Sequence, residues 1–491
     1  MSNLSLSDRA GFIGLGRFIR AISKLLFSVV IVRILTQYEY GSYRQIVLLY
    51  SIFSIIFFLG IPQSIYYWLP KTNDSNRKTL VLQSEILLFI LGIFLGVIFF
   101  ITSNTWANSF SNDQLSKLLK AFSIYPVFDF PIQVLPPILI CIEKHKLSAN
   151  VNVLFSTTYV LSLLIPLLLG FSLFEAFCSL LIVSAIQFVF VCVYLLKIFK
   201  EYHISFDKKL LISQLKYSIP LGISSILVII SRELDKLIIS FFFTPDKYAI
   251  YSIGARELPL VSIIPYAVSS TLFPKYVSLL ESKRYRRLLD LISSSIRKVG
   301  LIMIPIIPLF FILSKEIVNV LYTSDYLESI PVFKLYLILI LFHITAFDSI
   351  LLSMGLSKYI MQLTVIFVIL NLLLNILFIK LFGFIGPAIS TVIVTLIVTI
   401  LYIQKIGNQL DISWKKIMPY SVIMKIILIS LIALIPCVFI EFLNISDALK
   451  IIVVSVIYGT VYLMLLKKFE ILLAEDIDLL KRWIRFDVFK H

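Results

Sequence analysis

Charged residues are scarce in this chain of 491 residues: they make up 15% of the sequence, whereas hydrophobic residues make up 59%. Such a composition excludes a soluble globular protein. Only four cysteines are present, scattered through apolar segments, and no CxxC or His/Cys pairing accompanies them. The sequence therefore predicts neither a disulfide framework nor a metal site. It also lacks a GxxxxGK[ST] loop, the signature of a common nucleotide-binding site.

Long apolar runs make up most of the sequence. Stretches of about twenty residues or more recur from end to end, each long enough to cross a bilayer core of about 30 Å as a helix. The alternating polar and apolar pattern of transmembrane strands is missing. No short apolar core followed by a small-residue cleavage site opens the chain, so we expect no removed signal peptide. The sequence predicts an all-α polytopic membrane protein.

Fourteen spans account for these runs, and the distribution of cations orients them. The predicted spans are 12–35, 43–69, 80–102, 115–141, 147–169, 174–196, 217–243, 248–274, 291–313, 327–353, 359–380, 384–404, 417–440 and 447–466. Lys and Arg concentrate in alternate connections, as in the one that holds Lys71, Arg77 and Lys78, whereas the other connections carry mostly acids. The positive-inside rule then places both termini in the cytoplasm. The formal charge of +16 is thus a topology signal, and we expect no nucleic-acid partner.

The two halves of the chain resemble each other at an offset of about 208 residues. Thr36 and the segment Tyr40-Gly41-Ser42-Tyr43 match Thr244 and the segment Tyr248-Ala249-Ile250-Tyr251. An even number of spans separates the copies, so we expect two bundles in the same orientation, related by an axis along the membrane normal. The predicted divisions are an amino-terminal six-helix bundle (1–199), a cytoplasmic linker (200–216), a carboxy-terminal six-helix bundle (217–405), two additional transmembrane helices (406–468) and a cytoplasmic amphipathic tail (469–491).

Three cations lie inside the first span. Arg17, Arg20 and Lys24 are spaced i, i+3 and i+7, which places them on one face of a helix. Each cation facing lipid at mid-membrane would cost about 2.5–3.5 kcal/mol on insertion scales. We therefore expect this face to line a hydrated cavity for an anionic substrate. The repeat offset places Arg232 of the seventh span opposite Lys24 in the alignment, at about the same depth.

Short motifs in the second half of the chain support a family resemblance. Asn371 and Asn375 are followed by Gly383, Gly386, Ala388 and Thr391. With the repeated Y-[GA]-x-Y segments, these residues resemble the multidrug/oligosaccharidyl-lipid/polysaccharide (MOP) exporters, and most of all the Wzx-like polysaccharide transporters. The resemblance covers the first twelve spans, whereas the last two resemble the layout of the lipid II flippase MurJ. It implies two bundles that alternate between inward- and outward-open states around a basic cavity, with a lipid diphosphate sugar as cargo.

Further candidate residues follow from this resemblance and from their positions inside spans. We assign substrate binding to the cavity cations Arg17, Arg20, Lys24, Arg232, Lys236 and Arg256, and a coupling or network role to Glu233, Asp235, Asp129 and Asp348. In the seventh span Arg232 can pair with Asp235, and Glu233 with Lys236. Two interpretations of these pairs are open. The acids either neutralise the cations permanently and hold the helix in place, or release them when a diphosphate binds. For Asp129 and Asp348, hydrogen bonding between helices is the simpler explanation.

The predicted function is a flippase that moves a polyprenyl-diphosphate-linked oligosaccharide across the plasma membrane by alternating access, for surface polysaccharide of the O-antigen or capsule type. The alternatives are a lipid II-type peptidoglycan precursor flippase, a cation-coupled multidrug exporter and an integral-membrane glycosyltransferase or polymerase. We expect a transporter without a cofactor, and coupling to H⁺ or Na⁺ stays open. Membrane lipid, a polysaccharide polymerase and glycosyltransferases are the expected partners of a monomeric transport unit.

Overall fold

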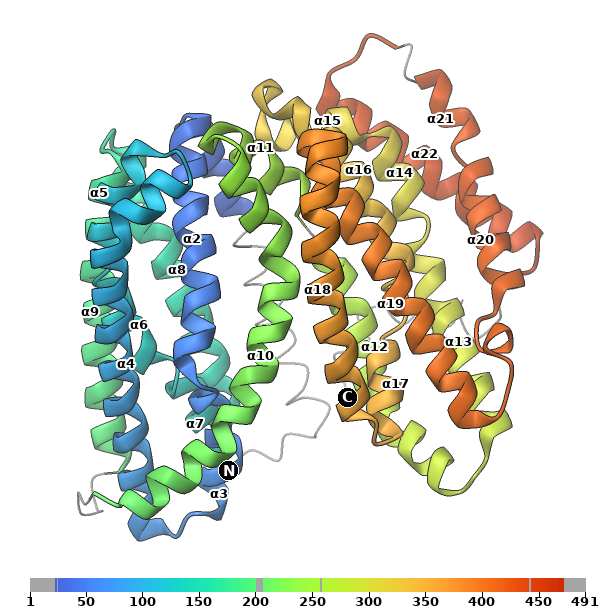
Figure 1. The fold of residues 1–491 in the computed structure, drawn as a ribbon. Helices are drawn as coiled ribbons and strands as arrows, with labels where there is room; N and C mark the ends of the chain where they lie inside the picture. Colours follow the sequence, from blue (N-terminus) through green and yellow to red (C-terminus); the bar gives the residue numbers. More distant parts are fainter. Residues whose placement is uncertain (1–22, 24, 200–205, 257, 441–442, 472–491) are drawn as a thin grey trace. The chain divides into compact units, whose positions relative to one another are not determined.

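The computed structural model describes residues 23, 25–199, 206–256, 258–440 and 443–471. Every regular element in these ranges is a helix (Figure 1), as the all-α prediction requires. The first predicted span lies largely outside the described residues, and so do the linker residues 200–205 and most of the tail.

Eight described segments are long and apolar enough to cross a membrane: Gln37–Lys71, Asn76–Ser109, His145–Leu168, Leu173–Ile198, Tyr285–Ile312, Ser357–Leu410, Tyr420–Ile440 and Asp447–Lys468. A ninth is formed by Asp113–Phe122 and Tyr125–Cys141 if this pair, bent by 49°, is one span. These segments confirm a multi-pass membrane protein. The total of fourteen spans stays a prediction.

The chain divides into two compact units, which we call unit 1 and unit 2. Unit 1 comprises the described residues of Met1–Ser252 and Val368–Lys380, and unit 2 those of Ile253–Phe367 and Leu381–His491. The predicted bundle limits, which follow the sequence repeat, are not tested by this division.

Unit 1 contains the amino-terminal helices. They are α2 (Gln37–Phe58), α3 (Ile61–Lys71), α4 (Asp74–Ser109), α5 (Asp113–Phe122), α6 (Tyr125–Ile132), α7 (Leu135–Cys141), α8 (His145–Leu168), α9 (Leu173–Ile198), α10 (Lys208–Phe242) and α11 (Pro245–Gly254), with part of α18 (Ser357–Phe382). Both copies of the repeated motif open a helix in the same way: Tyr40 N donates to Thr36 O and Tyr248 N to Thr244 O, each over 2.9 Å. The repeat in the sequence is therefore a repeat of local structure at the start of α2 and of α11.

Unit 2 contains the remaining helices. They are α12 (Pro259–Glu281), α13 (Tyr285–Met303), α14 (Ile306–Ile312), α15 (Ser314–Tyr322), α16 (Ile330–Ile338), α17 (Phe347–Ser353), α19 (Gly386–Leu410), α20 (Tyr420–Ile432), α21 (Ile435–Ile440) and α22 (Asp447–Lys468), with short 3₁₀ turns between some of them. Tyr458 and Tyr462 of α22 donate hydrogen bonds of 2.9 Å to the carbonyls of Pro305 and Leu301. Because lipid offers little hydrophobic drive for helix association, close packing and such interhelical hydrogen bonds hold the added helix in place.

Several predicted spans are broken, and proline explains most of the breaks. Pro62 opens α3 after a left-handed turn at Leu59 and Gly60, and Pro126 opens α6. The predicted span 248–274 is α11 and α12, which are separated because Pro259 holds the preceding Leu258 in an extended conformation. The predicted span 327–353 is likewise discontinuous, with residues 342–346 lying between a 3₁₀ turn and α17.

Candidate functional site

The charged cluster of the seventh span lies near the carboxyl end of α10 in unit 1. Lys236 Nζ lies 3.4 Å from Glu233 Oε2 and 3.8 Å from Asp235 Oδ1. It also donates a hydrogen bond of 2.7 Å to the carbonyl of Arg232, one helical turn away. The predicted Glu233–Lys236 pair is therefore present, and the Lys236 ammonium is held against its own helix with 11% of its side chain exposed.

Asp235 is engaged by a residue of another helix. Its side chain is buried, and its Oδ2 accepts a hydrogen bond of 2.9 Å from the phenol of Tyr251 on α11. The predicted pair between Arg232 and Asp235 is not formed. Arg232 is exposed, and its guanidinium makes no hydrogen bond or ion pair with any residue that the structure describes. In the α10 cluster, Asp235 and Glu233 thus contact Tyr251 and Lys236, and neither acid pairs with Arg232.

Arg44 lies near this cluster at the start of α2. The Tyr248 hydroxyl on α11 donates to the Arg44 carbonyl over 3.3 Å, which joins the beginnings of α2 and α11. A Cβ on Gly41 would lie 2.0 Å from the carbonyl oxygen of Pro245, so only glycine permits this approach of the two backbones. The Arg44 Nε is buried without a hydrogen-bond partner among the described residues. Arg44 directly follows the repeated motif in the sequence, and this position could have identified it as a candidate residue.

Asp129 lies in a separate polar network of unit 1, on α6. Its carboxylate accepts hydrogen bonds from the Tyr50 phenol of α2, from Tyr125 Oη over 3.2 Å and from Gln133 Nε2 over 3.0 Å. This network joins α2 to α6, as expected for hydrogen bonding between helices. Asp348, in the first turn of α17, is exposed and has no such bond to the described residues. Among those residues no group of three or more His, Cys, Asp or Glu is placed to hold a metal ion.

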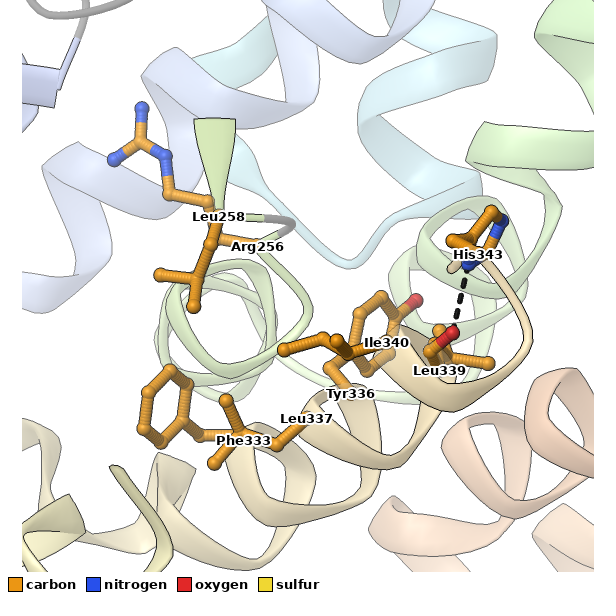
Figure 2. A pocket seen from close by; sticks show the side chains of 8 residues that line it. All are labelled: Arg256, Leu258, Phe333, Tyr336, Leu337, Leu339, Ile340 and His343. Atoms are coloured by element: carbon orange, nitrogen blue, oxygen red, sulfur yellow. Dashed lines mark hydrogen bonds between the residues drawn. The ribbon is translucent and has the colours of Figure 1, made fainter. Parts of the chain in front are cut away.

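Arg256 belongs to unit 2, in the non-helical segment between α11 and α12. Its Nη1 donates to the Tyr322 hydroxyl over 3.3 Å. Figure 2 shows the Arg256 guanidinium pointing away from the ring of Phe333 and the side chain of Ile340, which with Leu258 and others line a small pocket. The pocket is mainly apolar and gathers no second cation among the residues that line it. The Tyr322 hydroxyl therefore helps to position Arg256 in the break between α11 and α12.

The cations of the first span cannot be placed. Arg17, Arg20 and Lys24 lie outside the described residues, and so does Glu257. The predicted correspondence in depth between Lys24 and Arg232 is thus untested.

Comparison with solved structures shows which proteins share this fold. The chain is similar to "Lipid II flippase MurJ, inward closed conformation", with a TM-score of 0.74 and 16% identity over 94% of this chain and 99% of that chain. It is also similar to an inward-facing multidrug resistance MATE family transporter of the MOP superfamily, with a TM-score of 0.61 and 13% identity over 82% of this chain and 99% of that chain. An outward-facing MATE family transporter matches with a TM-score of 0.56 and 12% identity over 82% of this chain and 96% of that chain. No curated protein sequence matches the chain. At these identities the likeness establishes the fold, which is that of MOP-superfamily transporters.

The family follows from the sequence. A family described as "Polysaccharide biosynthesis protein" matches residues 30–331, which is more than half of the chain. The chain belongs to this polysaccharide biosynthesis protein family. Together with the fold, the match confirms the predicted MOP-type resemblance.

Proposed function

We propose that the protein is a flippase that moves a polyprenyl-diphosphate-linked oligosaccharide from the cytoplasmic to the outer leaflet of the plasma membrane. The diphosphate and its sugars would pass through a basic, hydrated cavity while the polyprenyl tail stays in lipid. No covalent step is needed, because the cargo leaves the protein chemically unchanged. The product would be building material for surface polysaccharide of the O-antigen or capsule type.

The observation that carries this proposal is the exposed guanidinium of Arg232, which pairs with no acid among the residues that the structure describes. The neighbouring acids are engaged elsewhere: Asp235 accepts a hydrogen bond from Tyr251, and Glu233 pairs with Lys236. A cation without an acid partner on a transmembrane helix is costly if it faces lipid and is typical of a substrate or ion pathway. Arginine also binds phosphate oxygens through two parallel hydrogen bonds, which suits a diphosphate better than an organic cation.

The family and the fold support the same class of cargo. The chain belongs to a family described by polysaccharide biosynthesis, and it shares its fold over 94% of its length with a protein whose title names it a lipid II flippase. Solved MATE family transporters of similar fold include an inward-facing and an outward-facing conformation. Alternating access is therefore the mechanism that we propose for this chain.

The individual residues have distinct roles in this proposal. Arg17, Arg20 and Lys24 would join Arg232 and Lys236 in neutralising the diphosphate, which offsets the loss of its hydration. Lys236 would exchange its contact with Glu233 for the substrate, which leaves the acids to take up a coupling H⁺ or Na⁺. Both termini would lie in the cytoplasm. A polysaccharide polymerase and glycosyltransferases would supply and consume the cargo of a monomeric transport unit.

The test is transport by the purified protein in liposomes. We expect translocation of a fluorescent polyprenyl-diphosphate glycan and no efflux of an organic cation such as ethidium. Arg232→Ala should slow glycan movement by about tenfold or more, because one charge-assisted contact is worth about 1.5–3 kcal/mol. Arg232→Lys, which keeps the charge, should retain part of the rate. Arg286→Ala, an exposed arginine on α13 before its apolar stretch, is the matched control and should move glycan at the normal rate.

Two results would contradict the proposal. Efflux of the organic cation without glycan movement would identify a drug exporter. Unchanged glycan movement by correctly inserted Arg232→Ala protein would remove the residue from the substrate path.

A further inference from the structure

A polar and aromatic face of unit 1 is exposed on α3 and on the first half of α10, away from the Arg232 cluster. On α3, Gln63, Tyr67 and Lys71 are spaced four residues apart, so they follow one side of the helix, and all three are exposed. On α10, Ser213 and Tyr217 are exposed with the same spacing. A surface that faces only lipid tails would present aliphatic side chains, whereas this one presents hydroxyl, amide and ammonium groups.

The two tyrosines of this face stack on each other. The ring centroids of Tyr67 and Tyr217 lie 4.3 Å apart and their planes differ by 14°. The Lys71 Nζ lies 3.8 Å from the centroid of Tyr67. A ring stacked at this distance leaves no room for an ammonium on the same face, so Lys71 and Tyr217 cover opposite faces of Tyr67. Tyr217 is 36% exposed, so its side chain is accessible to another group.

The backbone beneath this stack is held rigidly. Gln214 of α10, which is buried, donates to Ser64 Oγ of α3 over 3.0 Å and to Ser84 Oγ of α4 over 2.8 Å. A Cβ on Gly60 would lie 2.3 Å from the carbonyl oxygen of Ser218, and one on Gly222 would lie 2.8 Å from the carbonyl carbon of Leu59. The two glycines thus let α3 and α10 pack backbone to backbone, side by side in Figure 1. Rigid helices position an aromatic pair more precisely than a loop would.

We propose that Tyr67, Tyr217 and Lys71 form a sugar-binding platform for the glycan that follows the diphosphate of the lipid-linked cargo. The inference rests on the proposed function and adds a recognition site for the sugar itself. The apolar C–H face of a pyranose ring fits the electron-rich face of Tyr217, and the Lys71 ammonium lies within reach to donate to sugar hydroxyls or to a phosphate oxygen. The amide of Gln63 and the hydroxyl of Ser213 supply further polar contacts along the same face.

The position of the platform agrees with uptake of cargo from the cytoplasmic leaflet. Lys71 ends α3, and Arg77 and Lys78 follow it at the start of α4. Lys208 and Lys209 open α10 on the way to Tyr217. The positive-inside rule assigns this end of unit 1 to the cytoplasm, where the proposed cargo is assembled. The platform would therefore contact the glycan early, before the diphosphate reaches the Arg232 cluster.

The test compares two ligands on the full-length protein in nanodiscs. One is polyprenyl diphosphate carrying a single N-acetylhexosamine, and the other is the same lipid diphosphate without sugar. Tyr217→Leu should weaken binding of the sugar-bearing lipid by about tenfold and change binding of the bare lipid by less than about twofold, because it removes an aromatic contact of modest energy. Tyr217→Trp, which keeps a ring, should retain the preference for the sugar-bearing lipid. Tyr420→Leu is the control, because Tyr420 is an exposed tyrosine of unit 2 (46% exposed), and it should change neither affinity.

Two outcomes would overturn the inference, and a third, distinguishable from them, would contradict the proposed function on which it rests. Equal losses for both ligands in Tyr217→Leu would mean that the stack supports the fold or anchors the protein at the membrane interface. No loss for either ligand would mean that the sugar binds elsewhere. Failure of the unmodified protein to bind either lipid would instead contradict the proposed function. Thermal unfolding of each variant shows whether it is folded, and the Trp variant tests the platform even if the Leu variant is not.

Discussion

The phenol of Tyr251 on α11 donates a hydrogen bond of 2.9 Å to the carboxylate of Asp235 in the α10 cluster. Asp235 lies three residues after Arg232, within reach of an ion pair along one helix. The bond from α11 fixes the carboxylate instead, and the Arg232 guanidinium is left without an acid partner among the described residues. In the proposed function, this hydrogen bond keeps Asp235 from neutralising a cation that would bind the cargo.

Removing this phenol should cost more than removing its neighbour in the motif. Tyr251→Phe should lower the free energy of unfolding by about 1.5–3 kcal/mol, because the lost bond goes to a charged group. Tyr248→Phe should cost only about 0.5–1.5 kcal/mol, because the Tyr248 hydroxyl donates over 3.3 Å to the neutral carbonyl of Arg44. Denaturation of both purified variants in detergent measures the difference. Equal losses would show that Asp235 does not depend on the phenol.

The crossing of α3 and α10 should tolerate no side chain at Gly222. A methyl group there would lie 2.8 Å from backbone atoms of Leu59, so Gly222→Ala should destabilise the protein by about 1–3 kcal/mol through overpacking. Gly459→Ala is the matched control, because Gly459 lies inside α22 and a Cβ added there would meet no heavy atom within 4 Å. That substitution should stabilise the helix by up to about 1 kcal/mol. Thermal unfolding measures both, and a harmless Gly222→Ala would contradict the tight crossing.

A buried ion pair should tie α22 to α15 in unit 2. Lys450 Nζ lies 2.8 Å from Glu316 Oε1, and the two side chains are 13% and 7% exposed. Lys450→Met alone should destabilise the protein by about 3–5 kcal/mol, because it leaves the Glu316 carboxylate buried without its cation. The double variant Lys450→Met, Glu316→Gln should recover much of this loss. A double-mutant cycle of unfolding free energies tests the coupling, and strictly additive losses would exclude it.

Asp129 should act in structure rather than in ion coupling. Asp129→Leu leaves the phenols of Tyr50 and Tyr125 and the amide of Gln133 without their acceptor, so the unfolding free energy should fall by about 3 kcal/mol or more. Asp129→Asn keeps one acceptor oxygen and should be milder. Glycan transport by the Asn variant should respond to an imposed H⁺ or Na⁺ gradient as the unmodified protein does. Loss of that response in a stable variant would make Asp129 the coupling site instead.

Much of the fold could be predicted from the sequence because the membrane imposes a simple rule. Apolar runs must be helical in lipid, and helices cover the predicted apolar runs from the second onward, although only eight or nine of the described segments are long and apolar enough to span. The repeated motif also predicted two equivalent segments, and these form the first turns of α2 and of α11. Breaks at Pro62, Pro126 and Pro259 follow from the missing N–H of proline. The break at residues 342–346 contains no proline and has no comparable signal in the sequence.

The candidate site was less predictable, because helical spacing gives neighbours only along one helix. It correctly predicted that Glu233 approaches Lys236. It could not predict that Tyr251, from the next helix, would engage Asp235 in place of Arg232. The stacking of Tyr67 on Tyr217 is likewise a contact between helices about 150 residues apart in the sequence, which no local pattern encodes.

The most direct test of the central claim is the accessibility of position 232 in the membrane. In a variant whose native cysteines (Cys141, Cys178, Cys192 and Cys437) are replaced by alanine, Arg232→Cys should react with a membrane-impermeant thiol reagent. Polyprenyl diphosphate should protect the thiol, because the phosphates would occupy the space in front of it. A thiol that does not react would face lipid or packed protein, and one that reacts without protection would lie outside the substrate path. Either result would contradict a hydrated chamber for phosphorylated cargo.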